Sequence, residues 1–311
     1  ANSLPSHRKG YVLKRLRESW QWYLLLLPGL VYLIIFLYGP MYGVQIAFRS
    51  YSAKLGIVDS QWVGLKWFLR FMDSSDFGQI LWNTISLSLY TIAVSFPLPI
   101  IFALMLNAMR AERFKKVVQS VAYMPHFIST VVIVNLMNLI FSPISGIYGN
   151  VFRLFGGEGF PSDLRGLPET FQHMYVWSGV WQTLGWSTII YTAALAGVSQ
   201  ELHEAAMIDG ASRWQQLWRI TIPCIWPTII IQLILKVGHI MSVGYEKVFL
   251  MQQSTNLGVS QIISTFVYEQ GIAARQYDYA TAIGLFNAAI NLVVLLIVNR
   301  IAKKRSNVSL F

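Results

Sequence analysis

Charged residues are scarce in this sequence of 311 residues. Asp, Glu, Lys and Arg make up 12% of it, about half the share that is typical of a soluble domain. By contrast, 55% of the residues are hydrophobic and the mean hydropathy is +0.49. Long stretches carry almost no charge. These features exclude an ordinary soluble domain and indicate a polytopic helical membrane protein.

Cysteine and known catalytic motifs are also scarce. The only cysteine is Cys224, so the sequence contains no pair that could form an internal disulfide. No Gly-x-Ser-x-Gly elbow or phosphate-binding glycine loop occurs, and the five histidines lack metal-ligand spacing. We therefore expect no catalytic residue, no metal and no cofactor on this chain. A membrane-embedded enzyme is the least favoured class.

Basic residues outnumber acidic ones and give a net charge of +10, which could suggest nucleic-acid binding. They form short clusters beside apolar runs, however, where Lys and Arg set the orientation of a membrane protein. We therefore expect no nucleic-acid partner. One cluster, over residues 7–20, predicts a basic amphipathic segment (1–21) on the inner membrane face and its lipids. A membrane domain (22–305) and a short tail (306–311) follow.

Six apolar windows of about 20 residues predict an all-α fold with six transmembrane helices. They cover residues 22–46, 80–108, 117–141, 174–198, 224–249 and 280–301. Two longer polar stretches, 49–79 and 141–173, separate some of these spans. Lys and Arg are more numerous, and nearer to the helix ends, on the side that carries both termini. This asymmetry places the N-terminus and the C-terminus inside the cell.

A sizeable polar interval, residues 199–223, separates the fourth and fifth predicted spans and therefore faces the cytoplasm. Ser199 and Ser212 stand where N-caps of two short helices are expected, the second with a capping-box glutamine three residues on. Gly210 suits a left-handed helix end, and Pro223 suits the first turn of the next helix. The alternative for this interval is an ordinary amphipathic surface loop.

Polar side chains interrupt the fifth predicted span. Gln232, Lys236 and His239 are spaced by four and three residues. Glu246 lies seven residues further on, so one continuous helix would place all four on one face. A charged group inside a membrane costs about 2.5–3.5 kcal/mol and therefore faces protein or water. The stripe predicts a translocation pathway; the alternative is that Lys236 pairs with a neighbouring helix or with Glu246.

Polar and aromatic residues of three other spans extend this predicted pathway. Tryptophan faces stack on sugar rings, and Asn, Gln and Lys donate hydrogen bonds to hydroxyls or carboxylates. The alternatives are interfacial anchoring for tryptophan and helix–helix ties for asparagine. The residues concerned are Asn135, Asn138, Trp181, Gln182, Trp186 and Asn287.

The polar interval resembles the EAA loop of binding-protein-dependent ABC importer permeases. The likeness rests on Glu204-Ala205-Ala206, on Gly210 four residues later, and on Ile220-x-Ile222-Pro223. Ile222 stands where leucine is more usual in that family. There the loop forms a coupling helix that docks in a cleft of the ATPase subunit. By position, the resemblance assigns this contact to Glu204, Ala205, Ala206, Asp209, Gly210 and Ala211.

Five further segments are similar to the LplB-like polysaccharide and complex-carbohydrate branch of the maltose-permease-like group. They are residues 27–30, 40–43, 62–65, 123–129 and 279–287. The resemblance covers nearly the whole chain and implies half of a type I importer in the bacterial cytoplasmic membrane. It also implies a second, similar permease, two ATPases that bind ATP and magnesium, an extracytoplasmic solute-binding protein and an oligosaccharide substrate.

The sequence thus predicts a permease subunit of an ATP-driven oligosaccharide importer that works by alternating access. The alginate-oligosaccharide importer belongs to the same branch, and Lys236 and His239 on a pathway face would suit an acidic sugar. One rival hypothesis is an ABC permease for another solute, such as a glycerol phosphate or a peptide. A rival from another class is a stand-alone channel or sensor, which needs no coupling loop.

Overall fold

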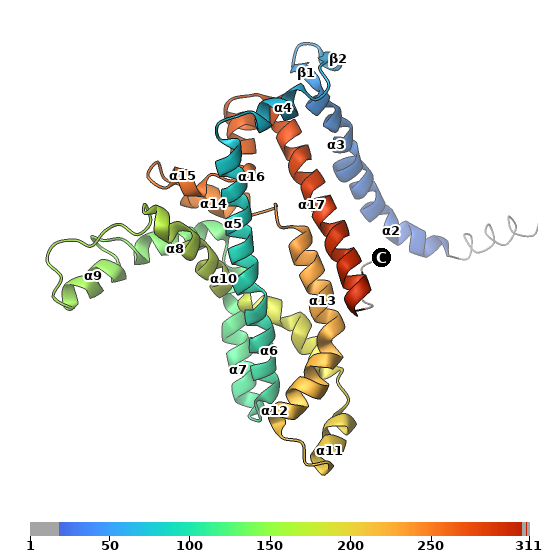
Figure 1. Cartoon of the computed structure of the whole chain (residues 1–311), viewed down its shortest axis with the longest axis vertical. Coiled ribbons are helices and arrows are strands. Elements are labelled where there is room, and N and C mark those ends of the chain that lie inside the picture. Colours follow the sequence, from blue (N-terminus) through green and yellow to red (C-terminus); the bar gives the residue numbers. More distant parts are fainter. Residues whose placement is uncertain (1–18, 307–308, 310–311) are drawn as a thin grey trace, which may run out of the picture. The chain divides into compact units, whose positions relative to one another are not determined.

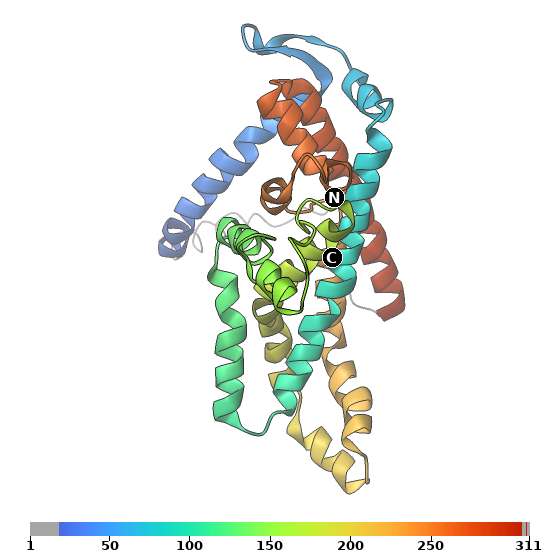
Figure 2. The same ribbon diagram turned by 90° about the vertical axis from the view of Figure 1, so that its left-hand side faces the viewer.

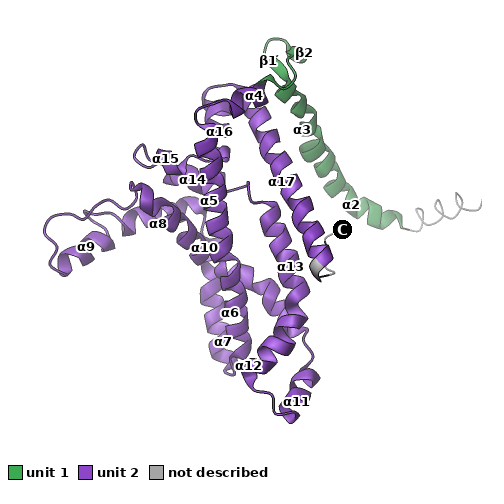
Figure 3. Ribbon diagram, viewed as in Figure 1, with its two compact units in different colours: residues 1–66 green, residues 67–311 purple. Residues whose placement is uncertain are grey.

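The computed structural model describes residues 19–306 and 309, and most of them are helical (Figure 1). The chain divides into two compact units, residues 1–66 and 67–311, which Figure 3 shows in different colours. The predicted basic segment 1–21 and tail 306–311 lie largely outside the described residues. The division of the chain into these segments stays a prediction.

The first unit begins with one long apolar helix. It runs through α2 (Trp20–Tyr32), the π-helical η1 (Leu33–Tyr38), α3 (Gly39–Met41) and the 3-10 helix η2 (Tyr42–Phe48). This helix contains the predicted span 22–46, and nearly all of its apolar side chains are exposed within the chain. A lipid-facing helix has this character, because lipid does not penalise exposed apolar surface.

A β-hairpin follows, formed by β1 (Arg49–Ser52) and β2 (Gly56–Trp62) in antiparallel pairing. The Arg49 guanidinium lies across it and donates hydrogen bonds to the carbonyls of Val58 (2.6 Å) and Ser60 (2.8 Å). The sequence predicts an all-α fold, and this hairpin shows that the prediction is wrong for residues 49–62. Strands this short contain no long apolar run, so a search for membrane-length windows cannot find them.

The second unit contains the remaining helices. In order they are α4 (Lys66–Met72), α5 (Phe77–Ser95), α6 (Pro97–Ala108), α7 (Glu112–Tyr123), η3 (Met124–Phe127), α8 (Thr130–Ile140), α9 (Ile147–Leu154), α10 (Pro168–Ala196), α11 (Gln200–Ile208), α12 (Arg213–Gln216), η4 (Leu217–Thr221), α13 (Ile222–Gly238), α14 (Tyr245–Met251), α15 (Leu257–Ser260), α16 (Ile263–Tyr268), η5 (Glu269–Ala273) and α17 (Tyr277–Ser306). In both Figures 1 and 2, the turn between α6 and α7 lies at the same end of this unit as α11.

α10 is the central helix of the second unit. Its Val176 shares a buried cluster with Leu87 of α5 and Val248 of α14. A second cluster joins α10 to α6 and to Ile225 of α13. A third, around Phe71, packs α4, α5, α16 and α17 together. Burial of each large apolar side chain contributes about 1.5–3 kcal/mol, and the first two clusters therefore hold α10 among its neighbours.

The third and fifth predicted spans are not continuous helices. Residues 117–141 form α7 and α8, which meet at an angle of 100°. Between them lies η3, where buried Pro125 cannot donate a backbone hydrogen bond. Residues 224–249 form α13, then a non-helical linker bounded by Gly238 and Gly244, then α14. Glycine favours interruption of a helix, because it loses the most backbone freedom there.

Four helices of the described chain are long and apolar enough to cross a membrane, and the bent pair α7–α8 would add a fifth. The four are Trp20–Phe48, Phe77–Ala108, Arg213–Gly238 and Tyr277–Lys304. α10, predicted as the fourth span, has 29 residues but is not among them. Its many polar and aromatic side chains lower its mean hydropathy. The total of six spans stays a prediction.

The segment before α10 is fastened by an ion pair. Arg165 donates through Nε to Asp163 Oδ1 (2.7 Å) and through Nη1 to the carbonyl of Asn138 in α8 (3.3 Å). Asn256 Nδ2 donates in turn to the carbonyl of Arg165 (3.0 Å). The hydrogen bond from Arg165 holds the pKa of the Asp163 carboxyl below its usual range. The pair therefore anchors this segment to α8 and to the chain after α14.

Gly185 of α10 allows close contact with the end of α7. A β-carbon at this position would lie 2.2 Å from the carbonyl oxygen of Ala122. We expect Gly185→Ala to cost about 1–3 kcal/mol of folding free energy and to lower the thermal unfolding midpoint in detergent. Gly284→Ala in α17 is the matched control, since no described neighbouring atom lies within 4 Å of a β-carbon there. Equal midpoints for the two variants would contradict this close contact.

The Asp163–Arg165 pair predicts an acid-sensitive anchor. Because the pKa of Asp163 is lower in the fold than the value of about 3.9 in an unfolded chain, its stabilising effect is complete above that value. It is lost as the pH falls through the folded pKa. We expect amide-exchange protection of residues 161–167, corrected for intrinsic rates, to hold at pH 5–8 and to fall below about pH 4.

Asp163→Asn should lower this protection at pH 7 and remove its acid dependence. Glu158→Gln, a change of an exposed carboxylate in the same stretch, is the control and should behave as the unmodified chain. Identical acid profiles for Asp163→Asn and the unmodified chain would show that the pair does not anchor the segment.

Candidate functional site

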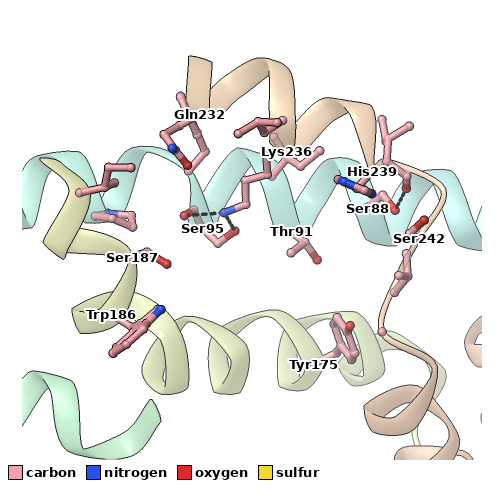
Figure 4. Close-up of a pocket in the computed structure, with 18 of the residues that line it drawn as sticks. Ser88, Thr91, Ser95, Tyr175, Trp186, Ser187, Gln232, Lys236, His239 and Ser242 are labelled. Atoms are coloured by element: carbon pink, nitrogen blue, oxygen red, sulfur yellow. Dashed lines mark hydrogen bonds between the residues drawn. The ribbon is translucent and has the colours of Figure 1, made fainter. Parts of the chain in front are cut away.

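A cavity of about 600 Å³ lies between α5, α6, α10, α13 and the linker after α13 (Figure 4). This volume is within the range of small-molecule sites. The lining combines hydroxyls, an amide, two bases and aromatic rings, and the described lining residues include no carboxylate. Its polar and aromatic members are Ser88, Thr91, Ser95, Phe96, Tyr175, Trp186, Ser187, Tyr191, Gln232, Lys236, His239 and Ser242.

Lys236 reaches from α13 to the end of α5. Its Nζ donates to the carbonyl oxygen (3.0 Å) and to Oγ (2.8 Å) of Ser95. That carbonyl is free because the residue four positions on is Pro99, which has no N–H. The ammonium has three donors, so a third is left for a ligand in the cavity. Lys236 is thus tied to a neighbouring helix, as the alternative proposed, and still lines the cavity.

His239 is the C-cap of α13 and also lines the cavity, as does Gln232. The prediction that Gln232, Lys236, His239 and Glu246 share one helix face is wrong for Glu246. Because α13 ends at Gly238, Glu246 lies in the first turn of α14 and does not continue the face that carries Lys236. The structure therefore brings together the first three members of the stripe.

The linker after α13, residues 239–244, is held by side chains of two other helices. The Ser88 hydroxyl of α5 donates to the carbonyl of Ile240. Asn291 Oδ1 of α17 accepts the N–H of Met241 (2.9 Å). These contacts satisfy backbone groups that helical hydrogen bonds no longer serve. Asn291 therefore ties this linker to α17.

α10 contributes the opposite, aromatic side of the cavity (Figure 4). Tyr175 and Trp186 are 11 residues apart and so lie on the same face of this helix. Trp186 is 48% exposed. Behind Tyr175, the buried Lys247 donates from Nζ to the Tyr175 carbonyl (3.0 Å) and lies 4.9 Å from the centre of its ring. A second lysine, absent from the sequence predictions, therefore lies close to the cavity.

The predicted pathway residues of α8 and α17 lie outside this cavity. Asn135 is exposed on α8. Asn138 instead lines a smaller pocket of about 100 Å³ together with Arg165. Asn287 of α17 is partly buried, and its Oδ1 has no hydrogen-bond partner among the described residues. A transport role for these three asparagines stays a prediction.

Two predicted residues of α10 also lie outside the cavity lining. Trp181 is 51% exposed. Gln182 donates from Nε2 to the carbonyl of Ile128 (3.0 Å), just after the corner between α7 and α8. Gln182 therefore ties two helices together in this structure, and Trp181 lies at the surface of the chain.

The hydroxyl-bearing residues of α5 are cavity members that the predicted site omitted. Ser88, Thr91 and Ser95 follow one another by three and four residues, which is the spacing of one helix face. That spacing is visible in the sequence. Serines and threonines of a membrane helix also bond to their own backbone, however, so the sequence could not separate the two roles.

Residues 199–223 form a short helix, a corner and the start of a second helix. The second helix is not short, because α12, η4 and α13 continue into one another as a helix of 26 residues, Arg213–Gly238. Ser199 Oγ accepts the N–H of Glu201 (3.2 Å), and Ser212 forms the predicted capping box at the start of α12. Gly210 has a φ of +77°, the left-handed conformation that favours glycine. The predictions of both caps and of the glycine stop are confirmed.

The corner between α11 and α12 presents an exposed surface. Glu204, Ala205, Asp209 and Gly210 are exposed, whereas Ala206 and Ala211 are partly buried. Met207 and Ile208, which the predicted site omitted, are 58% and 87% exposed. A hollow of about 320 Å³ adjoins them and includes Ala206, Asp209, Gly210 and Ala211 in its lining. Large exposed apolar side chains at such a corner are typical of a contact with another protein.

Among the described residues, no group of three or more His, Cys, Asp or Glu side chains could hold a metal ion. The cavity is a candidate region for a small molecule, and the corner is a candidate region for a protein contact.

Sequence comparison identifies the family. A family model described as "Binding-protein-dependent transport system inner membrane component" matches residues 95–307. In Bacillus subtilis, the polygalacturonan/rhamnogalacturonan transport system permease protein YteP is 41% identical over 297 residues, which is 96% of this chain and 92% of that protein. The protein LplB of the same organism is also 41% identical over 297 residues, or 95% of this chain and 92% of LplB.

Solved structures give the same result. A bacterial ABC transporter involved in the import of the acidic polysaccharide alginate contains a chain of 36% identity and TM-score 0.86, with 95% of this chain and 99% of that chain covered. The alginate transporter in complex with its alginate pentasaccharide-bound periplasmic protein gives the same identity and TM-score, with 96% and 99% covered. This chain therefore belongs to the family of inner membrane components of binding-protein-dependent transport systems.

Proposed function

We propose that this chain is a permease subunit that carries acidic oligosaccharides through the cytoplasmic membrane. The observation that carries the substrate proposal is the Lys236 ammonium in a cavity whose described lining has hydroxyls and aromatic rings but no carboxylate. An ammonium with no carboxylate beside it attracts the carboxylate of a ligand, and the hydroxyls of the lining bind the hydroxyls of a sugar. The names of two relatives, which refer to polygalacturonan and to the acidic polysaccharide alginate, support the same substrate class.

In this proposal the chain has six spans, with both termini in the cytoplasm. α10 is then the remaining span, and its polar side chains face the cavity and other helices instead of lipid. The corner between α11 and α12 and the turn between α6 and α7 lie at the same end of the unit (Figures 1 and 2). Arg110 lies in that turn, and Arg113, Lys115 and Lys116 lie at the start of α7. That placement supports a cytoplasmic position for both, by the positive-inside rule.

The corner is proposed to dock in a cleft of an ATPase subunit that binds ATP and magnesium. Glu204, Asp209 and Gly210 are exposed there beside the apolar Met207 and Ile208. This chain then works with a second permease, two ATPases and an extracytoplasmic binding protein. Closure of the ATPases moves α11, and the cavity alternates between the two sides of the membrane.

A permease for a neutral or phosphorylated solute would use the same fold and the same coupling corner. It is less well supported, because the name of YteP refers to polygalacturonan, an acidic polysaccharide, and the name of LplB refers to no solute. A stand-alone channel or sensor would not explain the exposed apolar corner. Co-purification of this chain with an ATPase separates those classes.

Glu204 gives a test of coupling. We expect Glu204→Lys to reduce substrate-stimulated ATP hydrolysis of the complex in proteoliposomes by about 10-fold or more, since a reversed charge in a docking contact costs several kcal/mol. Glu158→Lys, the same change at an exposed residue before α10, is the matched control and should retain stimulation. Stimulation that survives Glu204→Lys unchanged would exclude the proposed role of this residue.

Lys236 gives a test of substrate class. Lys236→Met removes the charge-assisted hydrogen bond to a carboxylate, a contact worth about 1.5–3 kcal/mol. We therefore expect uptake of an alginate trisaccharide to fall by about 10-fold or more, and uptake of maltotriose to change much less. Lys236→Arg keeps the charge and should retain the preference for acidic sugars. Equal losses for both sugars would contradict acidic-substrate recognition.

A further inference from the structure

The corner between α7 and α8 is fastened to the cavity side of α10. The two helices meet at 100° around η3, and three residues on adjacent turns of α10 contact this corner. Gln182 donates to the carbonyl of Ile128, and Gly185 lies too close to Ala122 for any side chain. The third contact is made by Trp186, which also lines the cavity.

His126, in the middle of η3, stacks on this tryptophan. The ring centroids of His126 and Trp186 are 4.3 Å apart and the rings are almost parallel, with an angle of 6°. Phe127 approaches the same indole edge-on, at 6.2 Å and 81°. Trp186 is nevertheless 48% exposed, so the parts of the indole that these rings leave uncovered are accessible from the cavity.

His126 contacts α10 by stacking its ring on Trp186, not by a hydrogen bond from Nδ1. His126 Nδ1 is buried and has no hydrogen-bond partner among the described residues. Burying a polar atom without a hydrogen-bond partner costs folding free energy, so other contacts of the imidazole must hold the ring in place. The near-parallel geometry on Trp186 is such a contact.

We infer that His126 is a positioning residue for transport, which holds the indole of Trp186 in the orientation that the sugar meets. Without the imidazole face, the indole can adopt other rotamers and the aromatic wall of the cavity loses its shape. The corner of α7 and α8 then acts on the cavity through one ring-on-ring contact. This inference rests on the proposed function, because it takes Trp186 as a surface for the oligosaccharide.

The experiment uses the assembled complex in proteoliposomes with its loaded binding protein. Uptake is measured with a panel of uronate and neutral trisaccharides, and the sugar that the unmodified complex imports fastest is followed. We expect His126→Ala to lower uptake by about 2- to 10-fold, which corresponds to the loss of one aromatic pair. His126→Phe keeps a flat ring without Nδ1 and should retain uptake within about 2-fold. His126→Asn, which keeps a polar group but no ring, should fail like His126→Ala.

A double-mutant cycle with Trp186→Ala separates positioning from general damage. If His126 acts through the indole, then His126→Ala has no further effect in the Trp186→Ala background. If the loss of uptake in the double variant were the product of the two single losses, the inference would be wrong. It would also be wrong if His126→Asn retained uptake and His126→Phe did not. If Trp186→Ala lost uptake and His126→Ala did not, the inference would be wrong, but the proposed function would stand. Unchanged uptake in Trp186→Ala would remove Trp186 from the proposed pathway and the inference with it.

Discussion

The need to satisfy every backbone polar group inside a membrane is the constraint on which this structure depends. Lipid offers no hydrogen bonds, so wherever a helix is interrupted the freed groups need partners within the protein. Lys236 donates a hydrogen bond to the carbonyl of Ser95, for which Pro99 offers no helical N–H. Asn291 accepts the N–H of Met241 in the linker after α13. Ser88 donates to the carbonyl of Ile240 in the same linker, and Gln182 donates to that of Ile128 at the corner between α7 and α8.

Two of these partners, Lys236 and Ser88, also shape the candidate site, because they line the cavity. Interrupted helices bring non-helical backbone and polar side chains together in the lining of the cavity. Lys236 and Ser95 show both roles at once, since their contact satisfies a carbonyl and leaves an ammonium donor for a ligand. Irregular backbone at membrane depth is tolerated where it lines a cavity. In this chain the linker after α13 supplies His239, Ser242 and Gly244 to the cavity lining.

The parts of the fold that the sequence predicts well are those set by local chemistry. The caps at Ser199 and Ser212 and the stop at Gly210 need only their own neighbours, and all three are confirmed. The hairpin β1–β2 and the corner between α7 and α8 were missed. Hydropathy averages over a window, so it cannot detect a turn of 100° inside an apolar stretch.

By itself, the sequence determined the class of protein, the family and the caps and glycine stop of the corner between α11 and α12, because composition, spacing and capping act over a few residues. Only the tertiary structure decided which polar residues share one cavity. Gln232, Lys236, His239 and Trp186 meet there, whereas Asn135, Asn138, Trp181, Gln182 and Asn287 do not line it. The physical reason is that the breaks in α7–α8 and after Gly238 redirect the helices, and a side chain's surroundings follow from where its helix ends.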